Sequence, residues 1–158
     1  MAKAARPVPE GYHTITPQLT LDDAAGTIEW YRKALGAEEI SRSVGPDGKI
    51  MHAELKIGDS RFMVNDAMGG SKGPKSFGGS AAGLWLFVND SDTLFARAVG
   101  AGAKVQMPID DQFWGDRAGA VADPEGYVWW IATRKEDLTD AETNKRAEEF
   151  FRKMASER

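Results

Sequence analysis

The stretch TLDDAAGTIEWYRKALGAEE, residues 20–39, decides the fold that we predict for this chain. Asp22 and Asp23 can cap a helix, because a carboxylate at that position accepts a hydrogen bond from a free N–H group of the first turn. Apolar residues then recur at helical spacing, and Gly36 ends the helix. The apolar stripe consists of Ile28, Tyr31 and Leu35, flanked by Trp30 and Ala34.

The same order of signals recurs in FVNDSDTLFARAVGAGAKV, residues 87–105. Asn89-Asp90 stands where Asp22-Asp23 stands, and Gly102-Ala103 stands where Gly36-Ala37 stands. Short segments that alternate apolar and polar residues surround both helices, as half-buried strands do. The chain therefore reads as strand–helix–strand–strand–strand, twice, and this internal duplication is its most informative structural feature.

We expect a single domain over residues 1–158, with a first module at 12–65 and a second at 83–134. Residues 66–82 are rich in Gly, Ser and Lys without periodicity, which predicts a linker loop. The predicted strands are 15–21, 38–44, 49–57 and 61–65 in the first module, and 84–88, 104–109, 118–123 and 127–133 in the second. Pro108 indicates that its strand lies at the edge of a sheet.

The last 24 residues, 135–158, are predicted to form a C-terminal helix. Thr139 and Glu142 have the spacing of a capping box at its start. Phe150, Phe151 and Met154 form an apolar patch near its end.

Composition excludes several classes of function. The chain has 158 residues, 42% of them hydrophobic and 28% charged, which suits one globular domain. The net charge of −4 without a basic stripe argues against nucleic acid as a partner. The absence of cysteine excludes thiolate catalysis and cysteine-bound zinc. No apolar run is long enough to span a membrane, and the short N-terminal arm lacks the apolar core of a secretory signal, so we expect a cytoplasmic protein.

The order of these motifs resembles the vicinal oxygen chelate superfamily, which includes glyoxalase I, extradiol dioxygenases and the fosfomycin and bleomycin resistance proteins. The resemblance covers about residues 12–152 and is closest to the PhnB-like branch. It rests on residues 16–39 and on GPDGKIMHAELKIGDSRFMV (45–64), QFWGDRAG (112–119), DPEGYVWWIATR (123–134) and EDLT (136–139), of which FWGDR followed by DPEG is the most specific pair.

The resemblance implies an α+β fold in which two βαβββ modules form an open, cup-shaped barrel. Helices would cover the outside of this barrel, a small molecule would bind in the concavity, and the protein would be a homodimer.

The resemblance also implies where a metal would bind, and here this sequence departs from the family. Metal-dependent members carry four ligands, on the first and last strand of each module. The matching positions are Thr16, Met63, Gly83 and Trp130. None of these four side chains is a good ligand for a divalent cation, so we expect no metal at the family's site.

Strand alternation assigns side chains to the concavity, because alternate residues point to opposite faces of a sheet. We expect Ile15, Leu19, Leu21, Met51, Ala53, Leu55, Ile57, Phe62 and Val64 to pack under the helices in the first module. On the opposite face we expect Thr16, Gln18, Thr20, His52, Glu54, Lys56, Arg61, Met63 and Asn65. In the second module Gly83, Trp85, Phe87, Val128, Trp130 and Ala132 would point inward, and Leu84, Leu86, Val88, Tyr127, Trp129 and Ile131 toward the helix.

His52 and Glu54 admit three interpretations. They can be two ligands of a divalent metal, which would need further ligands such as Gln18 or Asp116. They can act as a general base or as a hydrogen-bonding pair that orients a ligand. They can also form a buried polar cluster in which Glu54 neutralises Arg61 on the next strand, because buried charges are normally paired.

Tryptophan is frequent, with five residues in the chain. Trp85, Trp114 and Trp130 fall where the resemblance places the cup and its rim, and they can form an aromatic box around a flat or cationic ligand. Trp30 and Trp129 are predicted to be core residues. Asp116-Arg117 is expected to fix its loop through hydrogen bonds to turn backbone rather than to contact a substrate, and His13 is assigned no role.

We therefore expect a protein of the glyoxalase and bleomycin resistance type that binds a small aromatic or amphipathic molecule in a metal-free cup. The candidate ligand-binding residues are Gln18, His52, Glu54, Arg61, Trp85, Trp114 and Trp130. The alternative is a lyase, isomerase or dioxygenase that uses His52 and Glu54 in acid–base catalysis or in an unusual divalent metal site.

Overall fold

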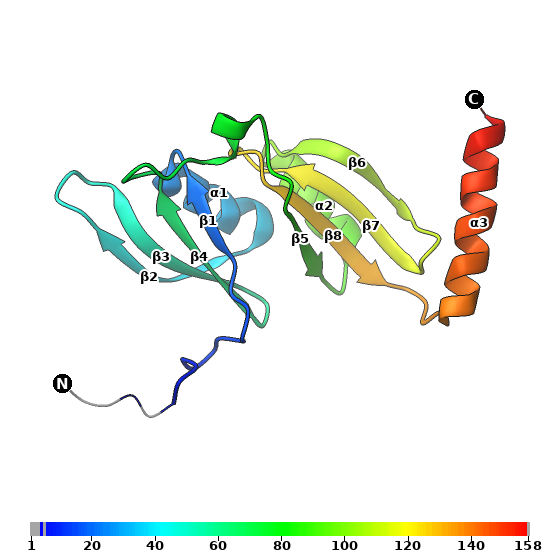
Figure 1. Cartoon of the computed structure of the whole chain (residues 1–158), viewed down its shortest axis with the longest axis horizontal. Coiled ribbons are helices and arrows are strands. Elements are labelled where there is room, and N and C mark those ends of the chain that lie inside the picture. Colours follow the sequence, from blue (N-terminus) through cyan, green and yellow to red (C-terminus); the bar gives the residue numbers. More distant parts are fainter. Residues whose placement is uncertain (1–3, 5, 158) are drawn as a thin grey trace. The chain divides into compact units, whose positions relative to one another are not determined.

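The structure is a computed structural model that describes residue 4 and residues 6–157 (Figure 1). Residues 1–3, 5 and 158, which belong to the predicted N-terminal arm and to the end of the predicted C-terminal helix, lie outside the described residues. The chain divides into two compact units. Unit 1 contains the described residues up to Ser80 together with Pro124–Gly126, and unit 2 contains Ala81–Asp123 and the chain from Tyr127 onward.

Unit 1 is built on one four-stranded mixed sheet in the order β1-β4-β3-β2. Its elements are β1 (Gln18–Leu21), α1 (Ala24–Leu35), β2 (Glu38–Val44), β3 (Ile50–Ile57), β4 (Ser60–Asp66) and the short 3-10 helix η1 (Pro74–Phe77). β1 and β4 are parallel, and the other neighbouring strands are antiparallel. The 3-10 helix η1 lies in the segment predicted as a linker loop.

Unit 2 repeats this plan with a sheet in the order β5-β8-β7-β6. Its elements are β5 (Gly83–Phe87), α2 (Ser91–Gly100), β6 (Lys104–Asp111), β7 (Asp116–Ala122), β8 (Val128–Arg134) and α3 (Asp140–Ser156). β5 and β8 are parallel, as β1 and β4 are in unit 1. The predicted βαβββ duplication is therefore confirmed, and β6, which contains Pro108, lies at a sheet edge as predicted.

Each sheet buries one face under the helix of its own unit (Figure 1). In unit 1 this face and α1 contribute Leu19, Leu21, Ile28, Tyr31, Ala53, Leu55, Phe62 and Val64 to the core. In unit 2 the corresponding core residues include Phe95, Ala98, Val121, Trp129 and Ile131. We call the other face of each sheet its open face, because no helix of the module's βαβββ pattern packs on it.

Close packing in unit 2 depends on a missing side chain at Gly119 of β7. A Cβ built at this position would lie 2.7 Å from the Phe95 ring of α2 and 2.9 Å from the backbone of Ile109. Only glycine lets the helix approach the strand this closely, since real carbon contacts are longer.

Two predicted core residues are exposed, and both errors have a local cause. Ile15 is 85% exposed because β1 begins only at Gln18, so no strand extends the alternation to residue 15. Met51 is 54% exposed because the β2–β3 register shifts between Ser43 and Val44. Ser43 pairs with His52 and Val44 with Ile50, so Met51 is the extra residue of a bulge and Ile50 is buried instead.

Asp66, at the end of β4, connects the start of α1 to the start of β3. Its Oδ1 accepts a hydrogen bond from the backbone N–H of Ala24 at 2.8 Å, and its Oδ2 accepts one from the backbone N–H of Ile50 at 2.7 Å. Because Asp66 is buried, water does not replace these bonds when the carboxylate is removed. Asp23 completes the helix start by accepting from the N–H of Gly26.

Glu125 provides a second buried carboxylate at the start of α1, within unit 1. It accepts hydrogen bonds from the backbone N–H groups of Asp22 at 3.0 Å and Asp23 at 3.1 Å. It also accepts a bond from the hydroxyl of Thr27 at 3.3 Å. A negative charge at this place is favourable because the first turn of a helix carries free N–H groups and the positive end of the helix dipole. In the sequence, Glu125 falls between the predicted strands 118–123 and 127–133, and no local pattern there indicates a contact with the first helix.

The capping box predicted for α3 is present. The side chain of Thr139 accepts from the N–H of Glu142, and the Glu142 carboxylate accepts from the N–H of Thr139. Among the described residues, no helix combines the length and the apolar character that crossing a membrane requires.

Asp66→Ala should destabilise the protein by about 2–4 kcal/mol, because each buried N–H that loses its partner costs about 1–3 kcal/mol. The free energy of unfolding from urea titration, followed by circular dichroism, measures this loss. Asp59→Ala is the matched control, since Asp59 is exposed in a turn, where its carboxylate accepts a hydrogen bond from the hydroxyl of its neighbour Ser60. Equal losses in the two variants would contradict the capping role of Asp66.

Candidate functional site

The open face of unit 1 is polar. The strand register aligns Gln18 with Met63, Met63 with Glu54, and Glu54 with Ser41 across the sheet. Gln18 donates a hydrogen bond from Nε2 to Oδ1 of Asn65 at 2.9 Å. The predicted inward face of this module therefore exists as a surface of the sheet, and its centre is the Glu54 side chain.

Glu54 lies between two nitrogen groups. Its Oε2 is 3.5 Å from Nη1 of Arg61, and its Oε1 is 3.7 Å from Nε2 of His52. The side chains of Glu54 and Arg61 are mostly buried, while that of His52 is more exposed. The arrangement has the geometry of the predicted polar cluster, in which Glu54 neutralises Arg61, and it leaves His52 at the solvent side of the pair.

Tyr12 joins this cluster, although it precedes the first strand. The Arg61 guanidinium lies over the Tyr12 ring, 5.1 Å from its centroid, at a distance that permits a cation–π interaction. Burial raises the pKa of Tyr12, and the neighbouring Glu54 carboxylate raises it further, whereas Arg61 opposes this shift. The phenol is therefore neutral at physiological pH, and its ring packs against the Arg61 guanidinium. No periodic pattern marks residue 12, so the sequence offered no signal for this role.

The open face of unit 2 is aromatic. Trp85 of β5 and Trp130 of β8 are register partners, and their rings are stacked, with centroids 4.7 Å apart and planes 5° apart. Phe87 continues the row at 5.8 Å from Trp85, and Trp114 meets Trp85 edge-on at 6.4 Å. Trp85 is 43% exposed and Phe87 is 59% exposed, so this face presents apolar surface to solvent.

Small side chains lie beneath these rings. The register pairs Ala120 of β7 with Trp130, and Ala118 with Ala132 of β8. Paired residues of antiparallel strands point to the same face, so these alanines form the floor of the aromatic surface. Ala118, Ala120 and Ala132 are nevertheless buried. Since alanine side chains are short, the large rings can lie close to the sheet above them.

The positions that carry metal ligands in relatives do not fit a metal here. A Cβ at Gly83 would lie 3.5 Å from Cδ1 and Nε1 of Trp130, so the indole occupies the space beside that position. Met63 and Thr16 supply a thioether and a hydroxyl, which are poor ligands for divalent cations. Within the part of the chain that the structure describes, no group of three or more His, Cys, Asp or Glu side chains could hold a metal ion.

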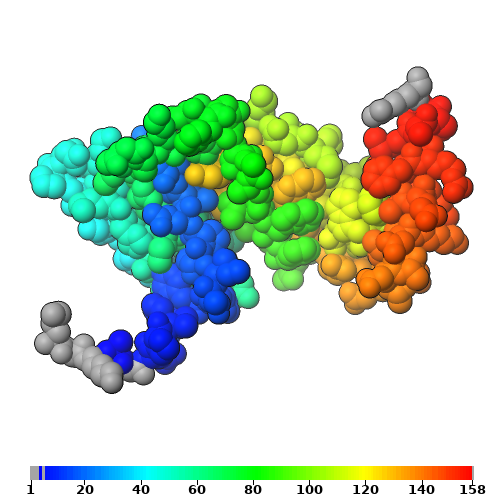
Figure 2. All heavy atoms as spheres, viewed as in Figure 1, coloured from blue at the N-terminus to red at the C-terminus, as the bar shows by residue number. Residues whose placement is uncertain are grey.

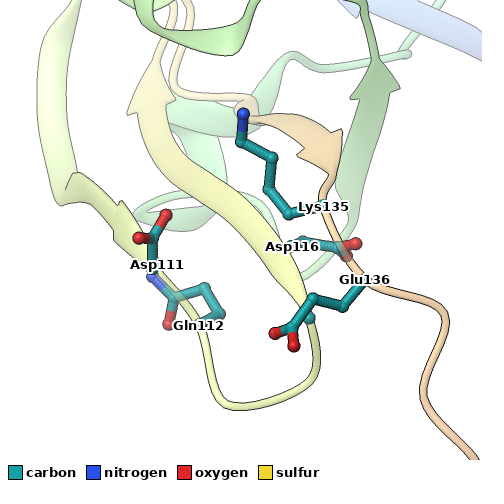
Figure 3. Close-up of a pocket in the computed structure, with 6 residues that line it drawn as sticks. Asp111, Gln112, Asp116, Lys135 and Glu136 are labelled. Carbon is teal, nitrogen blue, oxygen red and sulfur yellow. The ribbon is translucent and has the colours of Figure 1, made fainter.

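A hollow of about 290 Å³ lies in unit 2 where β6 ends and β7 begins (Figure 3). Asp111, Gln112, Gly115, Asp116, Lys135 and Glu136 line it. Its three carboxylates are each paired with an arginine: Asp111 with Arg117, Asp116 with Arg134, and Glu136 with Arg146. These ion pairs offset the charge of the acidic groups, although Oδ1 of Asp116 accepts no hydrogen bond from the residues that the structure describes. The hollow is therefore a structural junction between the hairpin and the segment after β8.

The structure therefore groups the predicted site residues into two sets. Gln18, His52, Glu54 and Arg61 share the open face of unit 1, and Trp85, Trp114 and Trp130 form contacts in unit 2. Asp116-Arg117 holds its loop through side chains instead of turn backbone: Asp116 binds Trp114 and Arg134, and Arg117 binds Asp92 and Asp111. Trp129 is a core residue, as predicted, and its indole N–H donates to Asp123 at 2.9 Å.

Comparison with known proteins shows that this chain belongs to a known superfamily. Residues 12–131 match the model of the Glyoxalase/Bleomycin resistance protein/Dioxygenase superfamily. The chain is 46% identical over 120 residues to the uncharacterized protein Mb0911c of Mycobacterium bovis, a match that covers 73% of this chain and 79% of that protein. It is 32% identical over 123 residues to the uncharacterized protein At5g48480 of Arabidopsis thaliana, covering 72% of this chain and 73% of the relative.

Solved structures agree with this family. TioX from Micromonospora sp. ML1 superimposes with a TM-score of 0.63 at 26% identity, covering 80% of this chain and all of that one. A glyoxalase/bleomycin resistance protein/dioxygenase from Nocardioides shares the fold, with a TM-score of 0.61 at 21% identity over 87% of this chain and 90% of that one. The predicted superfamily and fold class are confirmed, while the PhnB-like branch, the homodimer and the cytoplasmic location stay predictions.

Tyr12 should titrate above its ordinary pKa of about 10, because burial and Glu54 disfavour the phenolate. The difference between the 295 nm titrations of the native protein and of Tyr12→Phe isolates this group. Glu54→Gln should lower the midpoint, whereas Glu38→Gln, at an exposed acid on β2, should not.

The same shift predicts how stability changes with pH. Above about pH 10 the unfolded chain loses the phenol proton while the native protein keeps it, so native stability falls as the pH rises through the raised pKa of Tyr12. Tyr12→Phe should lack this part of the loss in urea titrations at alkaline pH. A phenol midpoint at or below its ordinary value would show that Tyr12 is solvated.

Proposed function

We propose, on the premise that this chain belongs to the Glyoxalase/Bleomycin resistance protein/Dioxygenase superfamily, that it binds a small aromatic or amphipathic molecule without a metal. The role is one of sequestration or resistance. The candidate aromatic contacts on the open face of unit 2 are Trp85, Trp114 and Trp130. The candidate polar contacts on the open face of unit 1 are Gln18, His52, Glu54 and Arg61.

The observation that carries this proposal is the exposed aromatic row on the open face of unit 2. Soluble proteins bury most of their large aromatic surface, and a contiguous exposed apolar patch marks a binding site. Trp85 and Phe87 together leave about half of their surface exposed, next to a stacked partner that fixes the orientation of Trp85. A planar ring placed against this row gains stacking and apolar burial without reordering the side chains first.

The open face of unit 1 supports recognition of polar groups. Glu54 and Arg61 hold each other in place, so their remaining hydrogen-bonding atoms are oriented before a ligand arrives. His52 adds a group that donates or accepts according to its protonation state. Gln18 is exposed and is oriented by its bond to Asn65.

A second candidate function, that of an enzyme, is supported by the short distance between His52 and Glu54. His52 and Glu54 lie 3.7 Å apart, and such a pair can transfer a proton in acid–base catalysis or contribute two ligands to a metal with outside help. The donor chemistry at Thr16, Met63, Gly83 and Trp130 favours the binding role over this enzymatic one.

Protein purified without a histidine tag should contain no stoichiometric zinc, nickel, manganese or iron by inductively coupled plasma mass spectrometry. The reason is that the family's ligand positions carry no suitable donors. A metal present at one equivalent and lost in His52→Ala, but kept in the exposed control His13→Ala, would replace the binding proposal with the enzymatic one.

Binding should be detectable with two planar tricyclic probes of opposite charge, proflavine and anthracene-9-carboxylate, by isothermal titration calorimetry. Trp85→Leu should weaken binding of at least one probe about tenfold, since loss of an aromatic stack costs about 0.5–1.5 kcal/mol beyond the lost apolar burial. Trp30→Phe is the control, because Trp30 lies on α1, which packs on the opposite face of its sheet from the open face. If neither probe binds, or if Trp85→Leu and Trp30→Phe bind equally well, the aromatic face is not a binding surface.

A further inference from the structure

We propose that Asp116 is a positioning residue for the aromatic face: it fixes Trp114, and Trp114 fixes Trp85 in the orientation that a ligand meets. This inference rests on the proposed binding function, and it assigns to the FWGDR segment, residues 113–117, a role in that function. All of its contacts lie within unit 2.

Both carboxylate oxygens of Asp116 contact nitrogen groups of other side chains, and no sequence pattern predicted these contacts. Its Oδ2 accepts a hydrogen bond from the indole N–H of Trp114 at 2.9 Å, and its Oδ1 lies 2.7 Å from Nε of Arg134. Only 3% of its side chain is exposed. A hydrogen bond to a buried carboxylate that is itself ion-paired is strong and directional, so it restricts rotation of the indole.

The turn that carries Trp114 is held at its backbone as well. The N–H of Gln112 donates to the carbonyl of Asp116 at 2.7 Å, and the carbonyl of Gly115 accepts from the N–H groups of Lys135 at 2.9 Å and Glu136 at 3.0 Å. Gly115 has a φ of +93°, and a Cβ there would lie 2.8 Å from the carbonyl oxygen of Glu136. These contacts hold the turn in the conformation that brings Trp114 against Trp85.

Trp114 limits the freedom of Trp85. The edge-on contact between them, with centroids 6.4 Å apart and planes 69° apart, blocks one direction of movement, while the stacked Trp130 blocks another. Trp114 also contacts Phe113, with ring centroids 5.0 Å apart, and Phe113 packs on Phe150 of α3 at 5.3 Å. Trp114 therefore has ring contacts besides Trp85, and we infer that it reduces the mobility that Trp85 would have as an exposed side chain before a ligand binds.

The hollow seen in Figure 3 belongs to the same structure, since Asp116, Gly115 and Glu136 are part of its lining. Arg134 and Arg146 come from the segments that close around the turn, and each neutralises one of these acids. This explains why a buried aspartate is present beside an aromatic cluster: a neutral apolar residue would fill the space but would leave the Trp114 N–H without an acceptor.

The test compares Asp116→Ala, Asp116→Asn and Trp114→Phe in the full chain. The control is Asp92→Asn, which removes an ion pair with Arg117 of the same segment but leaves the bond between Asp116 and Trp114 in place. The first readout needs no ligand: the near-ultraviolet and far-ultraviolet circular dichroism of stacked indoles, which reports the Trp85–Trp130 pair. Asp116→Ala should reduce this signal, Asp116→Asn should restore most of it because the amide oxygen still accepts from Trp114, and Asp92→Asn should leave it unchanged.

The second readout is affinity for proflavine and anthracene-9-carboxylate. Asp116→Ala and Trp114→Phe should each weaken binding roughly three- to tenfold. The variant that carries both changes should lose no more affinity than the single variant with the larger loss, because both changes remove the same support. Additive losses, or a dichroism signal that survives Asp116→Ala in a folded protein, would overturn the positioning role.

Unfolding and failure of the binding proposal give different patterns. If Asp116→Ala does not fold, it loses the far-ultraviolet helix signal and cooperative urea unfolding together. The positioning role of Asp116 is then judged from Asp116→Asn and Trp114→Phe. If neither probe binds the native protein, the proposed function fails, while the dichroism of Asp116→Ala and Asp116→Asn still confirms or refutes the link from Asp116 to the indoles.

Discussion

A four-stranded sheet that receives one helix from its own βαβββ pattern can cover only one of its two faces with that helix. This constraint acts in each unit separately: α1 covers one face of the first sheet, and α2 covers one face of the second. Side chains on the other face do not pack under that helix, so their chemistry can differ between the two units. The candidate functional groups of this protein lie on these two open faces for that reason.

The two open faces have diverged although the modules share one topology. In unit 1, Glu54, Arg61 and His52 share a polar face, and Tyr12 buries part of the guanidinium. In unit 2, indole rings share one face of the sheet with alanines, and Trp85 and Phe87 expose aromatic surface to solvent. Figure 2 shows the atoms that form the surface of the chain in this view, coloured along the sequence. The register makes Gln18 and Met63 of unit 1 equivalent to Trp85 and Trp130 of unit 2, and it makes Glu54 equivalent to Ala120. One topology therefore carries polar side chains in unit 1 and stacked rings beside alanines in unit 2.

Buried carboxylates accept hydrogen bonds at key positions of both units. Asp66 and Glu125 occupy the start of α1, and Asp116 and Asp123 hold the indole N–H groups of Trp114 and Trp129. Each of these acids has partners that compensate for its removal from water. The glycines at 115 and 119 allow the backbone to approach closely enough for this packing.

The sequence by itself determined the duplicated βαβββ order, the helix starts at Asp23, Asp90 and Thr139, and most of the strand faces, because these depend on periodicity and local capping. It also supplied the candidate residues of both open faces. Only the tertiary structure decided that Met51 belongs to a bulge, that Tyr12 supports Arg61, and that Trp85 stacks on Trp130. The physical reason is the same in all three cases: strand register and contacts between distant segments depend on how whole elements pair, and a local pattern of apolar and polar residues contains no information about the partner.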